Sequence, residues 1–202
     1  KWYFEVYNGA NAYAMVGVSV DGEHSEHSAD IYRYRGNGNK YNTSPATSYG
    51  ATYGAGDIIG VALDLDADTL VFYKNNVSQG TAFSSMQSGT YLPIVIVEGS
   101  NWAVSNFGQD SSFAGNSTAQ GNQDGNDIGD FYYAPPTGFL ALCTSNLPEV
   151  AVTPSEHFNV VTYTGTGSSQ AVTIGFQPDF VWNRKTNDAT NFYLQDALRG
   201  FG

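Results

Sequence analysis

Residues 56–80 read GDIIGVALDLDADTLVFYKNNVSQG, and this stretch decides the fold class. From Ile59 to Leu65, apolar residues alternate with small or acidic ones, a period of two that places one apolar row on one face of a β-strand. The acidic run that follows interrupts the pattern, because aspartate side chains bond their own backbone in turns. Leu70–Tyr73 resumes as a strand, and Asn75-Asn76 tolerates positive φ. The stretch predicts two antiparallel strands joined by an acidic turn, with a second turn after them.

The composition also favours β-structure. The chain has 202 residues, enough for one large all-β domain or for one domain and part of another. Charged residues make up 13%, about half of the usual share of roughly 25%, whereas Tyr and Phe are abundant. No window carries a sustained helical stripe with caps, and the one helix candidate is a short segment near Asn191–Arg199. We therefore predict an all-β fold.

The charge of the chain excludes some partners. The net charge is −11, with only 8 basic residues, so the chain lacks the basic footprint that nucleic-acid phosphates require. No run approaches the roughly 20 apolar residues of a membrane span, and the longest, Tyr91–Val97, contains Pro93. We expect neither nucleic-acid binding nor membrane insertion.

The later part of the chain changes in character. Gly108–Asp130 is poor in hydrophobic residues and reads as a long loop. A second unit begins near His157, where Phe158–Tyr163 and Gln170–Ile174 flank a Gly/Ser/Thr-rich turn and predict a hairpin. Phe180–Trp182 is a further predicted strand. Because the chain starts without Met and stops without a termination signal, we expect a piece of a longer protein.

Ordered motifs run through the first 113 residues. They are Lys1–Val6, Val16–Val18, Tyr34–Tyr41, Tyr49-Gly50, Gly56–Gly60, Leu63–Asp66, Leu70–Asn75, Gly80–Phe83, Tyr91–Pro93 and Asn106–Gly108. Together they resemble the SPRY (B30.2-like) domain family; one departure is Asn76, where the family usually has Gly. The resemblance implies a bent antiparallel β-sandwich of the concanavalin-like jelly-roll type. It also implies that loops at one end of the sandwich bind partners, without catalysis.

Other motifs resemble bacteriophage tail-fibre and related virion structural proteins. They are Gly129–Pro136, Leu140–Pro148 and Gly175–Trp182. The predicted organisation is a SPRY-like β-sandwich at 1–113 and a Gly/Asn-rich loop with a returning strand at 114–150 that completes the sandwich. Residues 151–202 would be the start of a second, incomplete β-rich module.

These resemblances lead to a functional expectation. We expect a non-catalytic structural or adhesion protein of the virion, on the surface or an appendage of the extracellular particle and without a cofactor. Its partners would be other virion proteins, a host surface protein or a glycan, and it would work as a homo-oligomer that gains avidity. One alternative is a SPRY interaction module of a cellular scaffold or ubiquitin ligase. Another is a polysaccharide-depolymerase fibre domain, although no carboxylate pair or catalytic motif stands out.

Candidate binding residues lie in or next to three loops, at 21–30, 36–56 and 98–102. These loops combine Tyr with Ser, Asn and Gly, as antibody-like binding surfaces do. The aromatic residues that could form binding platforms are Tyr32, Tyr41, Tyr49 and Trp102. Tyr34 and Tyr53 share the loops' composition but are better explained as core residues.

Metal and thiol chemistry have weak support. His24 and His27 lie two residues apart in a polar loop, and two ligands are too few for a closed site. The Asp64-x-Asp66-x-Asp68 pattern lacks the Gly and Glu of a calcium loop, so turn capping explains it better. The single cysteine, Cys143, forms no intrachain disulfide and is predicted to be a small buried hydrophobe.

Overall fold

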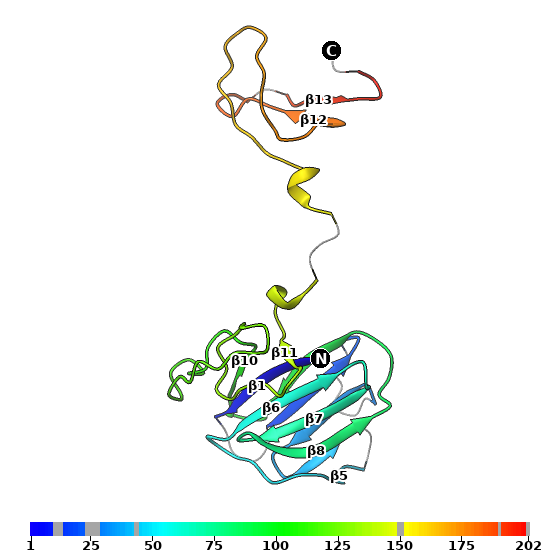
Figure 1. The fold of residues 1–202 in the computed structure, drawn as a ribbon, viewed down its shortest axis with the longest axis vertical. Helices are drawn as coiled ribbons and strands as arrows, with labels where there is room; N and C mark the ends of the chain where they lie inside the picture. Colours follow the sequence, from blue (N-terminus) through cyan, green and yellow to red (C-terminus); the bar gives the residue numbers. More distant parts are fainter. Residues whose placement is uncertain (10–13, 23–28, 43–44, 149–151, 190, 201–202) are drawn as a thin grey trace. The chain divides into compact units, whose positions relative to one another are not determined.

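The structure, a computed structural model, describes residues 1–9, 14–22, 29–42, 45–148, 152–189 and 191–200. The chain divides into two compact units, Lys1–Leu147 and Pro148–Gly202 (Figure 1). Within the described residues, helical structure is limited to the 3-10 turns η1 Thr144–Asn146 and η2 Pro154–Glu156. The predicted all-β class is confirmed.

The first unit is a sandwich of two sheets. The first sheet has the order β10-β1-β6-β7-β8, with β11 added beside β1, and the second has the order β5-β4-β3-β2-β9. Every strand pair is antiparallel except β1 with β11. The strands of the first sheet are β1 Trp2–Asn8, β6 Ile58–Asp64, β7 Thr69–Lys74, β8 Val77–Ser84, β10 Ala103–Asn106 and β11 Leu140–Ala141. Those of the second sheet are β2 Met15–Val20, β3 Ile31–Arg35, β4 Asn39–Tyr41, β5 Thr47–Ser48 and β9 Tyr91–Ile96. The predicted antiparallel β-sandwich is confirmed.

The stretch at 56–80 forms the meander β6-β7-β8. Its acidic turn is closed by Asp64, whose Oδ1 accepts hydrogen bonds from the backbone N–H groups of Asp66 and Ala67 at 3.1 and 3.0 Å. The second turn places Asn75 and Asn76 at φ 47° and 65°, the left-handed region that Asn tolerates. Both predicted turns are confirmed, including the capping role of Asp64.

Strand β1 serves two apolar clusters because its side chains alternate. Phe4 and Val6 point between the sheets, into a core that includes Val16, Tyr34, Ile59 and Phe72. On the outer face, Tyr3 packs with Ala62, Phe131 and Ala141. We call this second group the outer cluster.

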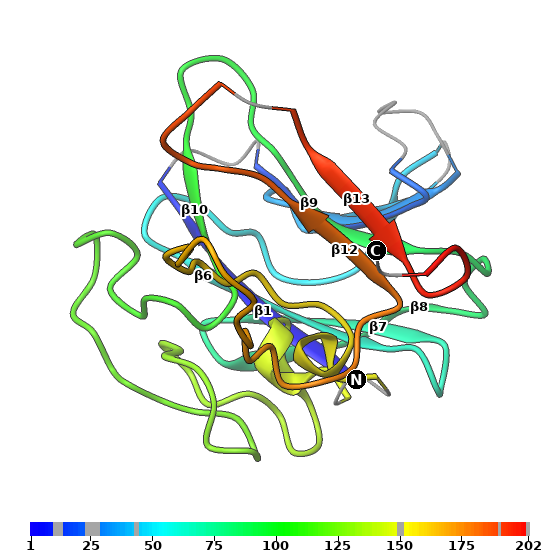
Figure 2. The ribbon, with the colours of Figure 1, turned by 90° about the horizontal axis from the view of Figure 1, so that it is seen from above.

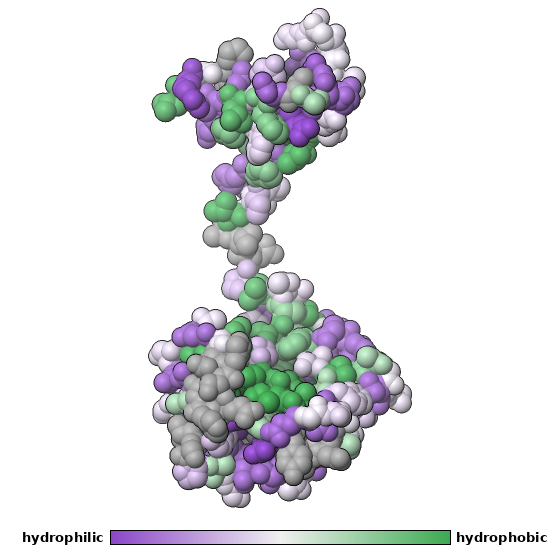
Figure 3. All heavy atoms as spheres, turned by 180° about the vertical axis from the view of Figure 1, so that it is seen from behind, coloured by the Kyte–Doolittle hydropathy of each residue, from purple (hydrophilic) through white to green (hydrophobic). Residues whose placement is uncertain are grey.

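The segment 107–147 supplies the cover of the outer cluster. It lies beside β10 and β1 in both ribbon views (Figures 1 and 2). Gly60 leaves room for Tyr3 here, because a Cβ at Gly60 would come within 2.5 Å of the Tyr3 hydroxyl. On the face of the first unit drawn in Figure 3, apolar residues gather in one patch.

The second unit contains a two-stranded sheet, β12 Phe180–Asn183 with β13 Tyr193–Asp196. The predicted strand at Phe180–Trp182 is confirmed. The helix candidate near Asn191–Arg199 is not a helix, because β13 runs through this segment. The predicted hairpin at 158–174 is also wrong, since those residues form no strands and one hydrogen bond, from Asn159 Nδ2 to the Ile174 carbonyl at 2.8 Å, joins its two arms. The described residues include no helix long and apolar enough to cross a membrane.

Candidate functional site

Three loops meet at the end of the sandwich where β1 finishes. The strand register pairs Tyr7 with Ile58 and Asn8 with Ala103, which brings the loops before β6 and β10 to this point. Backbone hydrogen bonds join them: Gly9 N–H to the Trp102 carbonyl at 3.1 Å and Asn8 N–H to the Asp57 carbonyl at 2.9 Å. We call this surface, formed by residues 7–9, 54–58 and 101–103, the Trp102 end.

The Trp102 ring is both exposed and fixed. Its side chain is 44% exposed, and its ring stacks on Tyr7 with centroids 5.9 Å apart and planes 24° apart. The ring also lies against the backbone of Gly9, where a Cβ would be 2.3 Å from the indole. An aromatic side chain held by packing loses little entropy when a partner covers it.

Aromatic contacts continue from Trp102 onto segment 107–147. The ring centroids of Tyr7 and Phe113 are 5.6 Å apart, and those of Phe113 and Tyr132 are 6.1 Å apart. Tyr132 packs edge-on against Tyr133, with a centroid distance of 4.8 Å. Phe113 is fully buried, whereas Tyr132 and Tyr133 are half-buried. We call these five residues, starting with Trp102, the aromatic row.

A buried carboxylate holds the far end of the aromatic row. Glu5 is fully buried on β1 and accepts hydrogen bonds from the backbone N–H groups of Tyr132 and Tyr133 at 2.9 and 2.8 Å. The Tyr3 hydroxyl and the Asn106 amide also donate to it, at 3.2 and 3.4 Å. Burial raises the pKa of Glu5, although these hydrogen bonds oppose the rise. Glu5 thus fastens segment 107–147 to the sheet.

The charges near the Trp102 end are paired. Asp57 accepts from Gly54 N–H at 2.8 Å and from Asn75 Nδ2 at 2.7 Å, and it lies 3.3 Å from the Lys74 ammonium. Burial alone would raise the pKa of Asp57, but these partners hold it below its ordinary value. Asp57 thus joins the loop before β6 to the turn after β7.

The predicted platform residues do not come together. Tyr32 is only 5% exposed; its ring packs edge-on against Phe83, and its hydroxyl accepts a hydrogen bond from Gln87 N–H at 3.0 Å. Its ring is therefore almost fully covered, because the side chain belongs to the core. Tyr34 and Tyr53 are core residues as predicted, at 0% and 2% exposure.

Tyr41 and Tyr49 lie apart from the aromatic row. Tyr41 is half-buried on β4, with the Arg33 guanidinium 4.5 Å from its ring centroid. Tyr49 packs edge-on against Tyr34 at 5.2 Å and donates to the Gly80 carbonyl at 2.5 Å. Burial raises the pKa of Tyr49 to about 12. Of the four predicted platform residues, Tyr32 is buried and Tyr41 and Tyr49 are half-buried, whereas Trp102 is exposed and belongs to the aromatic row.

Sequence reasoning missed Tyr7, Tyr132 and Tyr133. The signal for Tyr7 was present, since Tyr3, Glu5 and Tyr7 alternate on one face of β1. The position of Tyr132 and Tyr133 depends on contacts with residues more than 100 positions away, which no local pattern reveals.

The described residues contain no group of three or more His, Cys, Asp or Glu side chains that could hold a metal ion. His24 and His27 lie outside the described residues. Cys143 is half-buried against the outer cluster.

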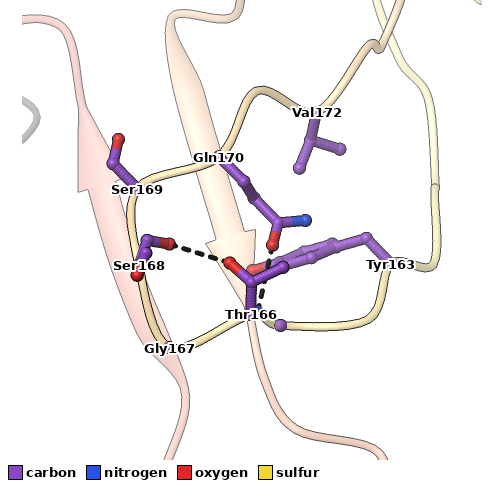
Figure 4. A pocket seen from close by; sticks show the side chains of 8 residues that line it. Tyr163, Thr166, Gly167, Ser168, Ser169, Gln170 and Val172 are labelled. Carbon is purple, nitrogen blue, oxygen red and sulfur yellow. Dashed lines mark hydrogen bonds between the residues drawn. The ribbon is translucent and has the colours of Figure 1, made fainter.

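The second unit has a shallow cavity of about 480 Å³ within residues 163–172 (Figure 4). In this view the Tyr163 ring lies below the Gln170 side chain and extends toward Thr166. Thr166 N–H donates to Gln170 Oε1 at 3.2 Å, and the Thr166 hydroxyl donates to the Ser168 carbonyl at 3.3 Å. Its polar groups thus bond mostly one another within a single loop.

Comparison with known proteins identifies the first unit. The sequence model of the SPRY domain matches residues 1–110. The chain belongs to the SPRY domain family. SPRY domains mediate protein–protein interaction, so this region is a protein-interaction module. Residues 153–202 match a domain of unknown function, DUF7483.

Several cellular proteins share the SPRY region. The chain is 29% identical over 152 residues to the ATP-dependent RNA helicase Ddx1 of Drosophila melanogaster, covering 71% of this chain and 18% of the helicase. It is 29% identical over 119 residues to the E3 ubiquitin-protein ligase RKP of Arabidopsis thaliana, covering 54% and 9%. It is 30% identical over 120 residues to human Ran-binding protein 9, covering 54% and 16%. The chain therefore spans less than a fifth of each of these relatives.

Solved SPRY structures are also similar. The SPRY domain of human HERC1 aligns with a TM-score of 0.40 and 26% identity, covering 46% of this chain and 64% of that one. A second human SPRY domain aligns with a TM-score of 0.44 and 20% identity, covering 50% and 72%.

Proposed function

We propose that residues 1–147 form a non-catalytic protein-recognition module that holds its partner at the Trp102 end. The observation that carries this proposal is the Trp102 ring, which is 44% exposed yet fixed between Tyr7 and Gly9. Interface hot spots are enriched in Trp and Tyr whose rings are rigid before binding. Tyr132 and Tyr133, linked to Trp102 through the aromatic row, add half-buried rings from outside the residues 1–110 that the SPRY model matches.

The biological setting that we propose is a cellular scaffold or ubiquitin-ligase system. The support comes from relatives named as a ubiquitin ligase and as Ran-binding proteins. The virion setting, with its extracellular location, host or virion partners and homo-oligomeric assembly, stays a prediction from the motifs in 129–148 and 175–182. Finding the chain by mass spectrometry in purified virions would favour that setting, and turnover of host capsular polysaccharide would favour the depolymerase.

The proposal is tested with the complete chain and a displayed peptide library. Selection on wild-type protein should enrich a peptide family, and Trp102→Ala should weaken its binding at least roughly ten-fold, the effect of losing about 1.4 kcal/mol. Trp182→Ala is the matched control, because Trp182 is 66% exposed in the second unit. Equal binding by wild type and Trp102→Ala, with unchanged melting temperatures, would refute the proposal.

A further inference from the structure

A second cavity opens between the two sheets, at the opposite end of the sandwich. Its volume is about 250 Å³, and its walls are mostly apolar; they include Trp2, Phe4, Leu63, Leu65, Tyr91 and Leu142. Trp2 pairs with Leu63 at the start of β1, whereas the Trp102 end lies at the finish of the same strand. The cavity is therefore independent of the surface proposed above.

The rim of this cavity carries negative charge. Asp21 accepts a hydrogen bond from the N–H of Thr90, a lining residue, at 2.8 Å, and Asp66 follows the lining residue Leu65 and is exposed. Asp64 binds the Lys1 ammonium at 2.8 Å. Burial raises the pKa of Tyr91 to about 12, and the nearby Tyr32, Asp68 and Asp21 add to the rise. Lys1 neutralises Asp64, whereas Asp21, Asp66 and Asp68 add negative charge beside the lining residues, so the rim attracts cations.

The size of the cavity and the form of its edge limit the occupant. Small-molecule sites usually measure about 300–1,000 Å³, so this cavity suits one inserted side chain better than a whole ligand. Strand β9 forms one edge of the second sheet, but Pro93 at its centre has no N–H to donate. Addition of a partner strand along β9 is disfavoured for that reason. The remaining mode of docking is insertion of one apolar side chain of the partner into the cavity.

We propose that this acid-rimmed cavity docks a basic peptide segment of a partner protein, which inserts one large apolar side chain between the sheets. The apolar anchor supplies most of the affinity by leaving water. Lysine or arginine residues beside the anchor contact the aspartates of the rim, which speeds association and rejects acidic partners.

The binding test uses Trp2 as a local reporter. The chain has 3 Trp, so a double variant with Trp102→Phe and Trp182→Phe keeps Trp2 as its one indole. The probes are three synthetic peptides: one Leu between two Lys-Arg pairs, the same peptide with Ala for Leu, and the same with Glu for the basic residues. The first should shift Trp2 emission saturably, the second should bind at least roughly ten-fold more weakly, and the third should not bind. Raising the salt concentration should weaken binding of the first peptide, because salt screens its charges.

Site variants tie the binding to the cavity. Leu65→Gln and Asp66→Lys should each weaken binding of the leucine peptide at least roughly ten-fold. Their controls are Leu92→Gln, an exposed leucine outside the cavity, and Asp179→Lys, an exposed aspartate of the second unit, and both should bind as the parent does. Circular dichroism checks that each variant is folded. The proposal is overturned if no peptide shifts Trp2 emission, if the alanine peptide binds equally well, or if the site variants bind unchanged.

Discussion

Both units contain large aromatic side chains, but the first unit buries several of them and the second leaves most of them exposed. In residues 1–147, Phe4, Tyr34 and Phe72 are each at most 2% exposed, inside a sandwich with two apolar clusters. In the described part of 148–202, no residue is buried, and Phe158 and Trp182 are 72% and 66% exposed. Alternating apolar residues thus form a core only where a second layer faces them.

The number of layers explains the difference. The first sheet of the sandwich has the second sheet on one face and segment 107–147 on the other, so both rows of β1 side chains are covered. The pair β12–β13 is a two-stranded sheet, which is marginally stable in water without a packed face. We expect stability to concentrate in the first unit.

The largest expected effect comes from matched phenylalanines in the two units. Phe72→Ala removes a fully buried ring that touches Tyr34 and Tyr49, and it should lower the free energy of unfolding by about 3–5 kcal/mol. Phe180→Ala removes a ring that is 55% exposed on β12 and should cost less than about 0.5 kcal/mol. Urea denaturation followed by fluorescence measures both. Similar losses in the two variants would mean that the second unit has a core of its own.

The next effect tests how segment 107–147 is held. Glu5→Ala leaves the N–H groups of Tyr132 and Tyr133 without their acceptor and should cost about 3 kcal/mol. Glu156→Ala, at an exposed glutamate of the second unit, is the control and should change little. Hydrogen exchange should show faster exchange at Tyr132 and Tyr133 in the Glu5 variant. Unchanged protection there would assign the hold on this segment to other contacts.

The same variant has a pH signature. Because burial raises the folded pKa of Glu5 above its ordinary 4.5, the folded protein binds this proton more tightly than the unfolded chain does. The stability from this group is fully present below the ordinary pKa and is lost as pH rises through the raised one. The difference in unfolding free energy between wild type and Glu5→Ala should therefore fall with rising pH across that window. A difference that grows with pH would contradict the assigned direction.

Local pattern predicted the part of the fold that is built from local contacts. The strand at Ile59–Leu65 and the turn at Asn75-Asn76 are each determined by neighbouring residues in the sequence, and both were predicted correctly. The outer cluster depends on Tyr3 meeting Phe131 across the chain, which composition cannot show. The hairpin at 158–174 failed although its local pattern was similar, because its residues are almost all exposed and the described part of the second unit provides no second layer over them. Tyr32 shows the limit for the site, since a loop-like composition did not reveal its place in the core.

The smallest effect concerns the turn between β7 and β8, where two adjacent asparagines have different roles. Asn76, at φ 65°, has a backbone that Gly adopts more easily, so Asn76→Gly should raise the free energy of unfolding by about 0.5 kcal/mol. Asn75 has φ 47° but also accepts from Ile58 N–H at 2.8 Å and donates to Asp57 at 2.7 Å. Asn75→Gly should therefore lower stability by about 1 kcal/mol, since two hydrogen bonds are lost. Urea denaturation of the two variants measures these opposite changes in the free energy of unfolding. If both variants gained stability, the Asn75 side chain would have no part in joining this turn to β6.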